Sequence, residues 1–281
     1  MYVKRLAVIG AGTMGADIAY VAANAGIPVV LKDVQQEVLD RAQRHIYDLF
    51  ENRVKRGRIT GEQAEARRQH IQYTTENGLL SDVSLAIEAV SENLDLKKSV
   101  FRELDQVLPP LSLIASNTSA LPISALASVT GRPDRVAGFH FFFPAHMMKL
   151  IEIVQGEETS RETVETLRRL AEELRKIPVL VKDSPGFIVN RVLMAAMAEV
   201  LRFQEETGVS YADIDQAVAR AKIAPMGPFV LADALGLDVT LEVAETLAAH
   251  YGERFGPANQ LQQLVKQGHL GIKSGHGFYA Y

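Results

Sequence analysis

The stretch LAVIGAGTMGADIAYVAANAG, residues 6–26, decides the fold of this chain. An apolar run over Tyr2–Ile9 predicts a strand, and the alanine-rich residues Thr13–Ala25, closed by Gly26, predict a helix. Between them the letters GAGTMG at 10–15 form a G-x-G-x-x-G turn. A strand, this turn and a helix in that order are typical of a dinucleotide-binding unit. The alternative is a plain strand–turn–helix whose glycines serve only the turn geometry.

Each glycine of the turn has a physical reason to be there. Gly10 permits a tight turn, Gly12 lets a pyrophosphate approach the backbone, and Gly15 lets the helix pack closely on the strand. Thr13 and Met14 stand at the start of the helix, where the N-terminal N–H groups favour an anion. These five residues are therefore expected to bind the phosphates of a dinucleotide.

A second strand is expected at Pro28–Leu31, and Asp33 lies at its end, 18 residues after Gly15. An acidic residue at this point can accept hydrogen bonds from a ribose diol and repels a 2′-phosphate, which favours NAD over NADP. Two points leave the choice open. An aspartate is common in ordinary strand-end turns, and the neighbouring Lys32 could tolerate the extra phosphate.

Strand and helix patterns alternate as far as residue 154. Further strands are expected at Val83–Ala89, Leu111–Ser116, Val136–Phe142 and Lys149–Val154, and helices at Gln35–Arg56 and Leu94–Leu108. Later the periodicity is helical, over Phe187–Glu206, Tyr211–Ala221, Pro228–Leu235, Leu237–Tyr251 and Ala258–Gln267. The fold class is therefore α/β: a Rossmann-type, doubly wound and mostly parallel sheet, followed by an all-helical C-terminal domain. The break DSPG at 183–186 marks the boundary and gives domains 1–184 and 185–281.

Composition limits the possible functions. The 281 residues, at 30.9 kDa, are 47% hydrophobic and 23% charged, as in ordinary globular domains. A formal net charge of −4 gives no basic excess for nucleic acid, and the absence of cysteine excludes disulfides, thiolate nucleophiles and cysteine-ligated metals. We therefore expect no nucleic-acid partner and no metal. No targeting segment is visible, and a cytoplasmic location is the expectation.

The most membrane-like stretch is Phe187–Phe203. It falls short of the ~20 apolar residues of a membrane span because polar residues interrupt it. These are Asn190, Arg191, Glu199 and Arg202. We expect a buried helix without membrane contact, covered either by its own core or by a second subunit.

The letters GFHFFFP at 138–144 place His140 among aromatic side chains at the end of an expected strand. Ligands bind at the carboxyl ends of strands in this architecture, and an imidazole is suited to act as general base in the oxidation of an alcohol. The alternative is a core histidine that bonds only to backbone.

Glu152 favours the catalytic interpretation of His140. Alternation along Met148–Val154 puts its carboxylate on an apolar face, where a buried carboxylate needs a partner. A nearby imidazole would supply that partner, and the carboxylate would stabilise the imidazolium formed by proton abstraction. A face that is simply solvated is the alternative.

Other polar residues are candidates for the same edge of the sheet. Ser116–Ser119 follow an expected strand, and their hydroxyls and the Asn117 amide suit either ligand binding or capping of a helix that begins near Pro122. Asn190 lies in an apolar helix and reaches either a ligand or a backbone carbonyl. His146 is interpreted as a surface or loop histidine.

Taken together, these motifs resemble the 3-hydroxyacyl-CoA dehydrogenase family, and the resemblance covers essentially the whole chain. It rests on GAGTMG at 10–15, EAVSEN at 88–93, SNTS at 116–119 and GFHFFFPAHMMKLIEI at 138–153. It continues with DSPGFIVNR at 183–191, PMGPFVLAD at 225–233, GLD at 236–238 and SGHGFYAY at 274–281. Any one motif is modest support, whereas all of them in this order are highly specific.

The resemblance implies an activity and a catalytic group. The reaction is the reversible, NAD-dependent oxidation of an (S)-3-hydroxyacyl-CoA, in particular 3-hydroxybutyryl-CoA, to the 3-ketoacyl-CoA. By resemblance His140 is the catalytic base and Glu152 its orienting carboxylate. Ser119 and Asn190 match polar positions on the substrate side.

The resemblance also implies cofactor contacts and an assembly. Asp33 matches the acid at the ribose, and Asn117, Glu92 and Lys97 match positions that contact NAD. The helical C-terminal domain is expected to form a homodimer.

Three further residues are candidates for contacts with the substrate. Lys55 and Arg56, at the end of a long expected helix, could meet the phosphates of coenzyme A, or be merely solvated. The family usually reads HFFNP, and here Phe143 replaces the asparagine, so the hypothesis is that Phe143 reshapes the substrate pocket or its wall.

Two other functions are compatible with the same sequence. One is a dehydrogenase of a 3-hydroxyacid that carries no coenzyme A. The other is a nucleotide-binding protein on this fold that has lost turnover, although the presence of His140, Glu152, Ser119 and Asn190 argues against it.

Overall fold

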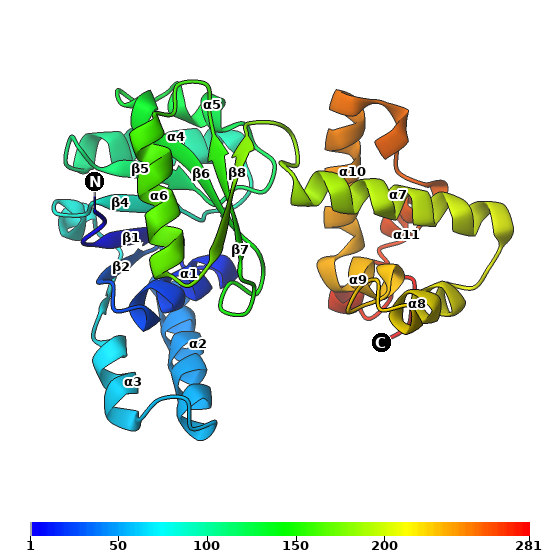
Figure 1. Cartoon of the computed structure of the whole chain (residues 1–281), viewed down its shortest axis with the longest axis horizontal. Coiled ribbons are helices and arrows are strands. Elements are labelled where there is room, and N and C mark those ends of the chain that lie inside the picture. Colours follow the sequence, from blue (N-terminus) through cyan, green and yellow to red (C-terminus); the bar gives the residue numbers. More distant parts are fainter. Residues whose placement is uncertain (1) are drawn as a thin grey trace. The chain divides into compact units, whose positions relative to one another are not determined.

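The computed structural model describes residues 2–281, which divide into two compact units. The first unit ends at Ser184 and contains the strands of the sheet, whereas the second, Pro185–Tyr281, is mainly helical (Figure 1). The expected α/β class, with a helical C-terminal part, is confirmed.

One eight-stranded sheet organises the first unit, in the order β3-β2-β1-β4-β5-β6-β7-β8. Its strands are β1 (Leu6–Ile9), β2 (Val29–Lys32), β3 (Ile71–Thr74), β4 (Leu85–Glu88), β5 (Leu113–Ser116), β6 (Val136–Phe141), β7 (Leu150–Gln155) and β8 (Ile177–Lys182). Neighbours pair in parallel except β6 and β7, which are antiparallel. The first six strands therefore end at one edge of the sheet, and β7 and β8 begin there.

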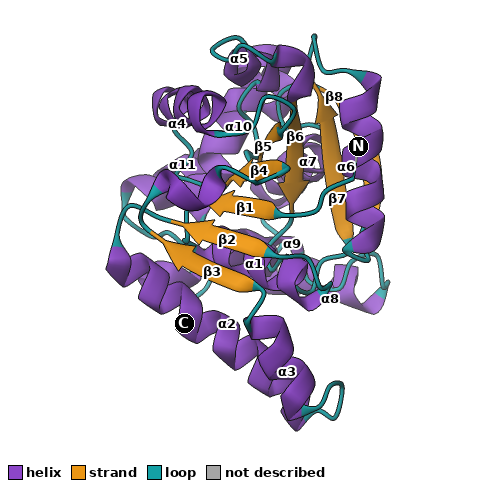
Figure 2. Cartoon of the chain, turned by 90° about the vertical axis from the view of Figure 1, so that its left-hand side faces the viewer, coloured by secondary structure: helices purple, strands orange, loops and turns teal. Residues whose placement is uncertain are grey.

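Helices cover both faces of this sheet (Figure 2). They are α1 (Thr13–Asn24), α2 (Gln36–Lys55), α3 (Gly61–Arg68), α4 (Leu94–Val107), α5 (Ile123–Ala127) and α6 (Arg161–Glu173), with short 3-10 turns at Asn77–Leu80 and Pro133–Arg135. In Figure 1, α1 and α6 lie in front of the sheet and α4 lies behind it. From β1 the strand order runs outward on one side to β2 and β3 and on the other side to β4, β5 and β6. Because the crossovers between parallel strands are right-handed, the helices that connect strands on these two sides lie on opposite faces of the sheet.

The strands are apolar almost throughout because both faces of the sheet are covered. Every residue of β1, β2, β4 and β5 is buried. Phe139 and Phe141 of β6 stack edge to face at 5.1 Å between ring centres and belong to the same core as Phe50 of α2. This core fixes the strand ends that carry the site.

Two glycines make the turn between β1 and α1 possible. Gly10 has a φ of +99°, a conformation that L side chains rarely adopt. A Cβ on Gly15 would lie 1.8 Å from the carbonyl oxygen of Gly10. The helix can therefore start directly on the end of β1 only because Gly15 has no side chain.

The second unit packs its helices around a separate core. The helices are α7 (Val189–Thr207), α8 (Tyr211–Arg220), α9 (Pro228–Leu235), α10 (Leu237–Tyr251) and α11 (Asn259–Lys266), with 3-10 turns at Glu253–Phe255 and Ile272–Ser274. Phe229, Leu237, Leu247 and Leu261 are fully buried in this core.

Asp233, which is 1% exposed, holds the last residues of the chain against α9. Its carboxylate accepts hydrogen bonds from the backbone N–H groups of Phe278 and Tyr279 at 2.9 and 3.0 Å, and from the hydroxyl of Tyr281 at 3.0 Å. Burial, together with this carboxylate, raises the pKa of Tyr281 to about 12. The motif FYAY is thus a structural element of the second unit.

Four elements of the first unit were not among those expected: α3, β3, α6 and β8. β3 and β8 are the two edge strands of the sheet. β3 buries only Ile71, and β8 contains Pro178, which weakens a strand pattern. The observed β1 also begins later than the expected strand, at Leu6.

Among residues 2–281, no helix combines the length and the apolar character that crossing a membrane requires. The longest apolar candidate, α7, keeps exposed positions along its length.

Candidate active site

Several predicted site residues of the first unit gather at one edge of the sheet. The glycine turn follows β1, Asp33 follows β2, and Asn117 follows β5. His140 is near the end of β6, and Glu152 lies opposite it on β7. In a doubly wound sheet this edge, at the carboxyl ends of the parallel strands, is where ligands bind.

The first turn of α1 fits a phosphate group. Gly12 is the N-cap, and within residues 2–281 no side chain caps this end of the helix. A Cβ on Gly12 would meet nothing within 4 Å, so the space beside it is open. The N–H groups at such a helix terminus carry partial positive charge, and Thr13 and Met14 are the residues that follow the cap. The turn therefore suits the pyrophosphate of a dinucleotide.

Asp33 is fixed at the turn by two backbone donors. Its Oδ2 accepts from Ala11 N at 2.8 Å and its Oδ1 from Gln35 N at 3.0 Å. A carboxylate has about four lone-pair sites, so capacity for a ribose diol remains. The neighbouring Lys32 is 7% exposed, and its ammonium lies 3.3 Å from Glu103. Lys32 is therefore engaged in an ion pair, not presented to a 2′-phosphate.

His140 and Glu152 form a buried hydrogen-bonded pair. Nδ1 of His140 lies 2.8 Å from Oε2 of Glu152, and the two side chains are 5% and 1% exposed. They are direct partners in the antiparallel register of β6 and β7, so the backbone ladder sets their separation. The expected pairing of the carboxylate with an imidazole is confirmed, while its catalytic role stays a proposal.

The pair defines how the imidazole can act. An ionised carboxylate only accepts hydrogen bonds, so the ring proton of neutral His140 is on Nδ1 and Nε2 is the basic atom. The carboxylate also stabilises the imidazolium that would form when Nε2 takes a proton.

A buried ion pair, not anticipated from the sequence, lies beneath the site. Glu88, at the end of β4, is 0% exposed, and its Oε1 accepts from Lys97 Nζ and from Val90 N, each at 2.7 Å. Its Oε2 accepts from the hydroxyl of Ser116 at 2.6 Å. The signal was present in the sequence as an acid ending an otherwise apolar strand, LAIE.

Glu92 connects this ion pair to Ser119, a residue predicted to contact the substrate. Its Oε2 lies 3.2 Å from Lys97 Nζ, and its Oε1 accepts from Thr118 Oγ1 at 2.5 Å and from Ser119 N at 2.9 Å. Lys97 is 1% exposed, so in this structure it supports Glu92. Direct contact of Glu92 or Lys97 with a cofactor stays a prediction.

The remaining predicted residues lie in different places. Asn117 accepts from Phe141 N at 2.9 Å and so fastens the end of the strand that carries His140. Phe143 is 63% exposed, beyond the end of β6. Asn190 is in the first turn of α7, in the second unit.

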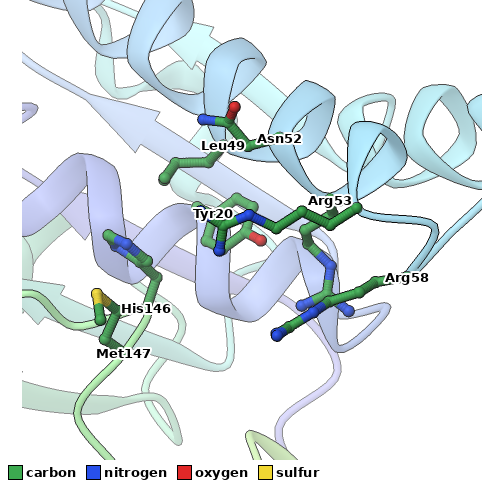
Figure 3. Close-up of a pocket in the computed structure, with 8 residues that line it drawn as sticks. Tyr20, Leu49, Asn52, Arg53, Arg58, His146 and Met147 are labelled. Carbon is green, nitrogen blue, oxygen red and sulfur yellow. The ribbon is translucent and has the colours of Figure 1, made fainter.

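A cavity of about 460 Å³, which we call the arginine cavity, lies between α1, α2 and the loop after β6 (Figure 3). Its walls are Tyr20, Leu49, Asn52, Arg53, Arg56, Arg58, His146 and Met147. Arg56 thus lines a cavity as a phosphate-binding residue would, whereas Lys55 is exposed and is not part of the wall. His146, expected in a loop or at the surface, is in the loop but half-buried in this wall.

A mostly parallel sheet of this order with an open glycine turn at its edge defines a Rossmann-type dinucleotide-binding protein, and the histidine–carboxylate pair lies at the same edge of that sheet. Residues 5–184 match the family model described as 3-hydroxyacyl-CoA dehydrogenase, NAD binding domain, and residues 186–281 match that of the C-terminal domain. The chain belongs to the 3-hydroxyacyl-CoA dehydrogenase family. The resemblance drawn from the sequence motifs is confirmed.

Individual relatives agree with this assignment. The chain is 39% identical to a probable 3-hydroxybutyryl-CoA dehydrogenase of Deinococcus radiodurans, over 99% of this chain and 100% of that protein. It is 43% identical to the 3-hydroxyadipyl-CoA dehydrogenase of Escherichia coli, over 99% of this chain and 59% of that one. The crystal structure of (S)-3-hydroxybutyryl-CoA dehydrogenase from Ralstonia eutropha superposes with a TM-score of 0.96 at 34% identity, covering 99% of each chain.

Proposed function

We propose that the protein catalyses the reversible, NAD-dependent oxidation of an (S)-3-hydroxyacyl-CoA to the 3-ketoacyl-CoA, with 3-hydroxybutyryl-CoA as the leading substrate. The observation that carries the proposal is the 2.8 Å pair of His140 and Glu152 at the sheet edge that also bears the glycine turn. Relatives named for 3-hydroxybutyryl-CoA and 3-hydroxyadipyl-CoA support the class of substrate.

In this proposal the protein supplies a base and a set of polar anchors. His140 Nε2 removes the proton of the 3-hydroxyl group, and Glu152 holds the imidazole and offsets its new charge. Bound NAD⁺ supplies the acceptor for the hydride that leaves C3. Ser119 and Asn190 position the hydroxyl or the thioester oxygen. In the reverse direction His140 returns the proton to the alkoxide oxygen.

The coenzyme A half of the substrate needs anion-binding groups, and the arginine cavity offers them. Arg53, Arg56 and Arg58 share its wall. Nε of Arg53 is buried and has no hydrogen-bond partner among the described residues, as expected of a group that a ligand satisfies. We assign the phosphates of coenzyme A to this cavity. Arg56 is part of its wall and Lys55 is not.

Nucleotide choice depends on Asp33 in this proposal. Asp33→Ser is expected to raise KM for NADH by about 10-fold or more, since hydrogen bonds to a charged group contribute about 1.5–3 kcal/mol. The ratio of kcat/KM for NADPH to that for NADH should rise at the same time, because the charge that repels the 2′-phosphate is gone. Asp48→Ser, which removes an exposed charge further along α2, is the matched control. An unchanged nucleotide preference in Asp33→Ser would show that Asp33 serves only the turn.

Phe143 is expected to influence the choice of acyl chain. In Phe143→Asn the ratio of kcat/KM for acetoacetyl-CoA to that for a longer 3-ketoacyl-CoA should change by about 10-fold. An apolar pocket distinguishes substrates that differ by one methylene by about this factor. Leu111→Asn, at a similarly exposed apolar residue before β5, should leave the ratio unchanged. Equal acyl preference in Phe143→Asn and wild type would remove Phe143 from the pocket.

We also propose a homodimer through the second unit. On α7, Val192 is 65% exposed and Phe203 48% exposed, and the two charged residues between them, Glu199 and Arg202, form an ion pair with each other. The expected mass in solution is twice 30.9 kDa. The double variant Val192→Glu/Phe203→Glu should elute as a monomer because it buries charge at the interface, while Ala219→Glu on α8 should not. Light scattering coupled to size exclusion decides, and a monomeric wild type would refute the assembly.

The first test of the activity is NADH oxidation with acetoacetyl-CoA, beside free acetoacetate and with NADPH in parallel. Turnover with acetoacetyl-CoA and NADH alone supports the proposal. Activity on free acetoacetate instead would point to a dehydrogenase of a CoA-free acid. NADH binding without turnover of any thioester would leave a nucleotide-binding protein and refute the proposed reaction.

A further inference from the structure

Asp17, in the middle of α1, holds two histidines from different parts of the chain. Its side chain is 1% exposed. Oδ1 lies 2.8 Å from Nε2 of His45 on α2, and Oδ2 lies 2.8 Å from Nδ1 of His146 in the loop after β6. A buried carboxylate requires such donors, so the two rings satisfy both oxygens at once. The proposed function assigns no role to this cluster, which we call the His–Asp–His bridge.

The bridge joins α1 to α2 and to the loop after β6, and it lies between two cavities. On one side is the arginine cavity, to which α1 contributes Tyr20, three residues after Asp17, and α2 contributes Leu49, four after His45. On the other side is a cavity of about 370 Å³, which we call the turn cavity. Its walls are Ala11, Gly12, Thr13, Ala16, Val38, Arg41, Ala42 and His45. Residues three or four positions after Asp17 and His45 therefore line the arginine cavity, and residues four positions before them, Thr13 and Arg41, line the turn cavity.

The two histidines line different cavities. His146 lines the arginine cavity, and His45 lines the turn cavity beside the glycine turn. The side chains of His45 and His146 are 43% and 24% exposed. Because the carboxylate engages Nε2 of His45 and Nδ1 of His146, the second nitrogen of each ring is the one that can meet a ligand. A protonated imidazole donates from both nitrogens, one to Asp17 and one to a phosphate oxygen.

The loop that carries His146 is fastened from a second direction. The ammonium of Lys176 is buried and donates to the carbonyl oxygens of Ala145 and Met148, in the latter case at 2.6 Å. Burial lowers the pKa of Lys176, and the charge of Asp17 opposes that shift. His146 therefore projects from a loop whose backbone is held on both sides, which favours one ring position.

We propose that Asp17 is a positioning residue that holds His146 as a ligand of the coenzyme A phosphates and His45 as a ligand of the dinucleotide phosphates. The inference rests on the proposed function for the identity of the two ligands. A single buried carboxylate then supports both binding sites through separate rings.

The experiment compares His146→Gln, His45→Gln and Asp17→Asn, with His250→Gln, at an exposed histidine of α10, as control. His146→Gln should raise KM for acetoacetyl-CoA by about 10-fold, the effect of one charge-assisted hydrogen bond. It should leave KM for acetoacetyl-pantetheine, which lacks the nucleotide phosphates, and KM for NADH unchanged. His45→Gln should raise KM for NADH alone. Asp17→Asn should raise both, because its amide can accept from only one ring.

Binding measured without turnover separates this inference from the proposed reaction. The dissociation constants of adenosine 3′,5′-bisphosphate and of NADH are determined by calorimetry for each variant. If wild type does not bind the bisphosphate, the assignment of the arginine cavity fails, and the NADH arm still tests the role of Asp17 through His45. If wild type binds it and His146→Gln binds equally well, the inference is overturned. Equal losses for acetoacetyl-CoA and acetoacetyl-pantetheine would also overturn it, since they would show a general structural effect.

Discussion

Exchange of His140 for glutamine is expected to lower kcat for the reduction of acetoacetyl-CoA by about 10²–10⁴-fold, the usual contribution of a general acid–base group. Glutamine keeps much of the size and polarity of the imidazole but cannot exchange a proton at neutral pH. His140 is buried and hydrogen-bonded to Glu152, and in the proposed reaction its ring takes part only in proton transfer. We therefore expect KM for NADH to change little. Steady-state kinetics with NADH absorbance measure both values.

Two further variants test whether the pair acts as a unit. Glu152→Gln should lower kcat as well, and the double variant should lose little more than His140→Gln alone, because the carboxylate acts through the imidazole. His250→Gln supplies the control for a histidine outside the site. Near-wild-type turnover in His140→Gln would contradict the assignment of the base.

Exchange of Lys97 for methionine is expected to destabilise the first unit by about 3–5 kcal/mol, the cost of leaving a buried charge without its partner. Glu88 is 0% exposed and accepts a hydrogen bond from the Lys97 ammonium at 2.7 Å. Water cannot take the place of this ammonium unless the surrounding side chains rearrange. Urea unfolding monitored by circular dichroism measures the loss. Lys98→Met, the same change on the next and more exposed residue, should cost far less.

The double variant Glu88→Gln/Lys97→Met distinguishes the loss of an ion pair from the loss of packing. Removing both charges should recover part of the stability that Lys97→Met loses, since the energies of contacting residues are not additive. A double variant as unstable as the sum of the single variants would refute the account based on an uncompensated charge.

The sequence predicted the central part of the fold because that part carries strong local signals. The G-x-G-x-x-G turn and the apolar strands β1, β2, β4 and β5 follow from glycine geometry and from burial on both faces. The edge strands β3 and β8 were missed since an edge buries few side chains, Ile71 in one case and Val181 in the other. α6 carried a readable signal, with a Ser160 cap before its apolar positions, and could have been predicted.

For the site, the sequence predicted which residue types gather at the carboxyl edge of the sheet but not the distances between them. Alternation placed Glu152 on a buried face, whereas its distance from His140 depends on the pairing of β6 with β7. The His–Asp–His bridge joins residues 28 and 129 positions apart, and no local pattern connects them. A lone aspartate in the apolar helix GADIAYVAAN was nevertheless a hint that Asp17 had partners elsewhere.

The antiparallel pairing of β6 and β7 separates chemistry from selectivity along the chain. The separation of His140 and Glu152 is set by a backbone register, so exchanges of exposed side chains within residues 142–149 leave that pair in place. That segment contains Phe143 and His146, both assigned here to ligand contacts. Substitutions in this loop should therefore alter acyl and carrier specificity, whereas an insertion inside either strand would shift the register and separate the pair.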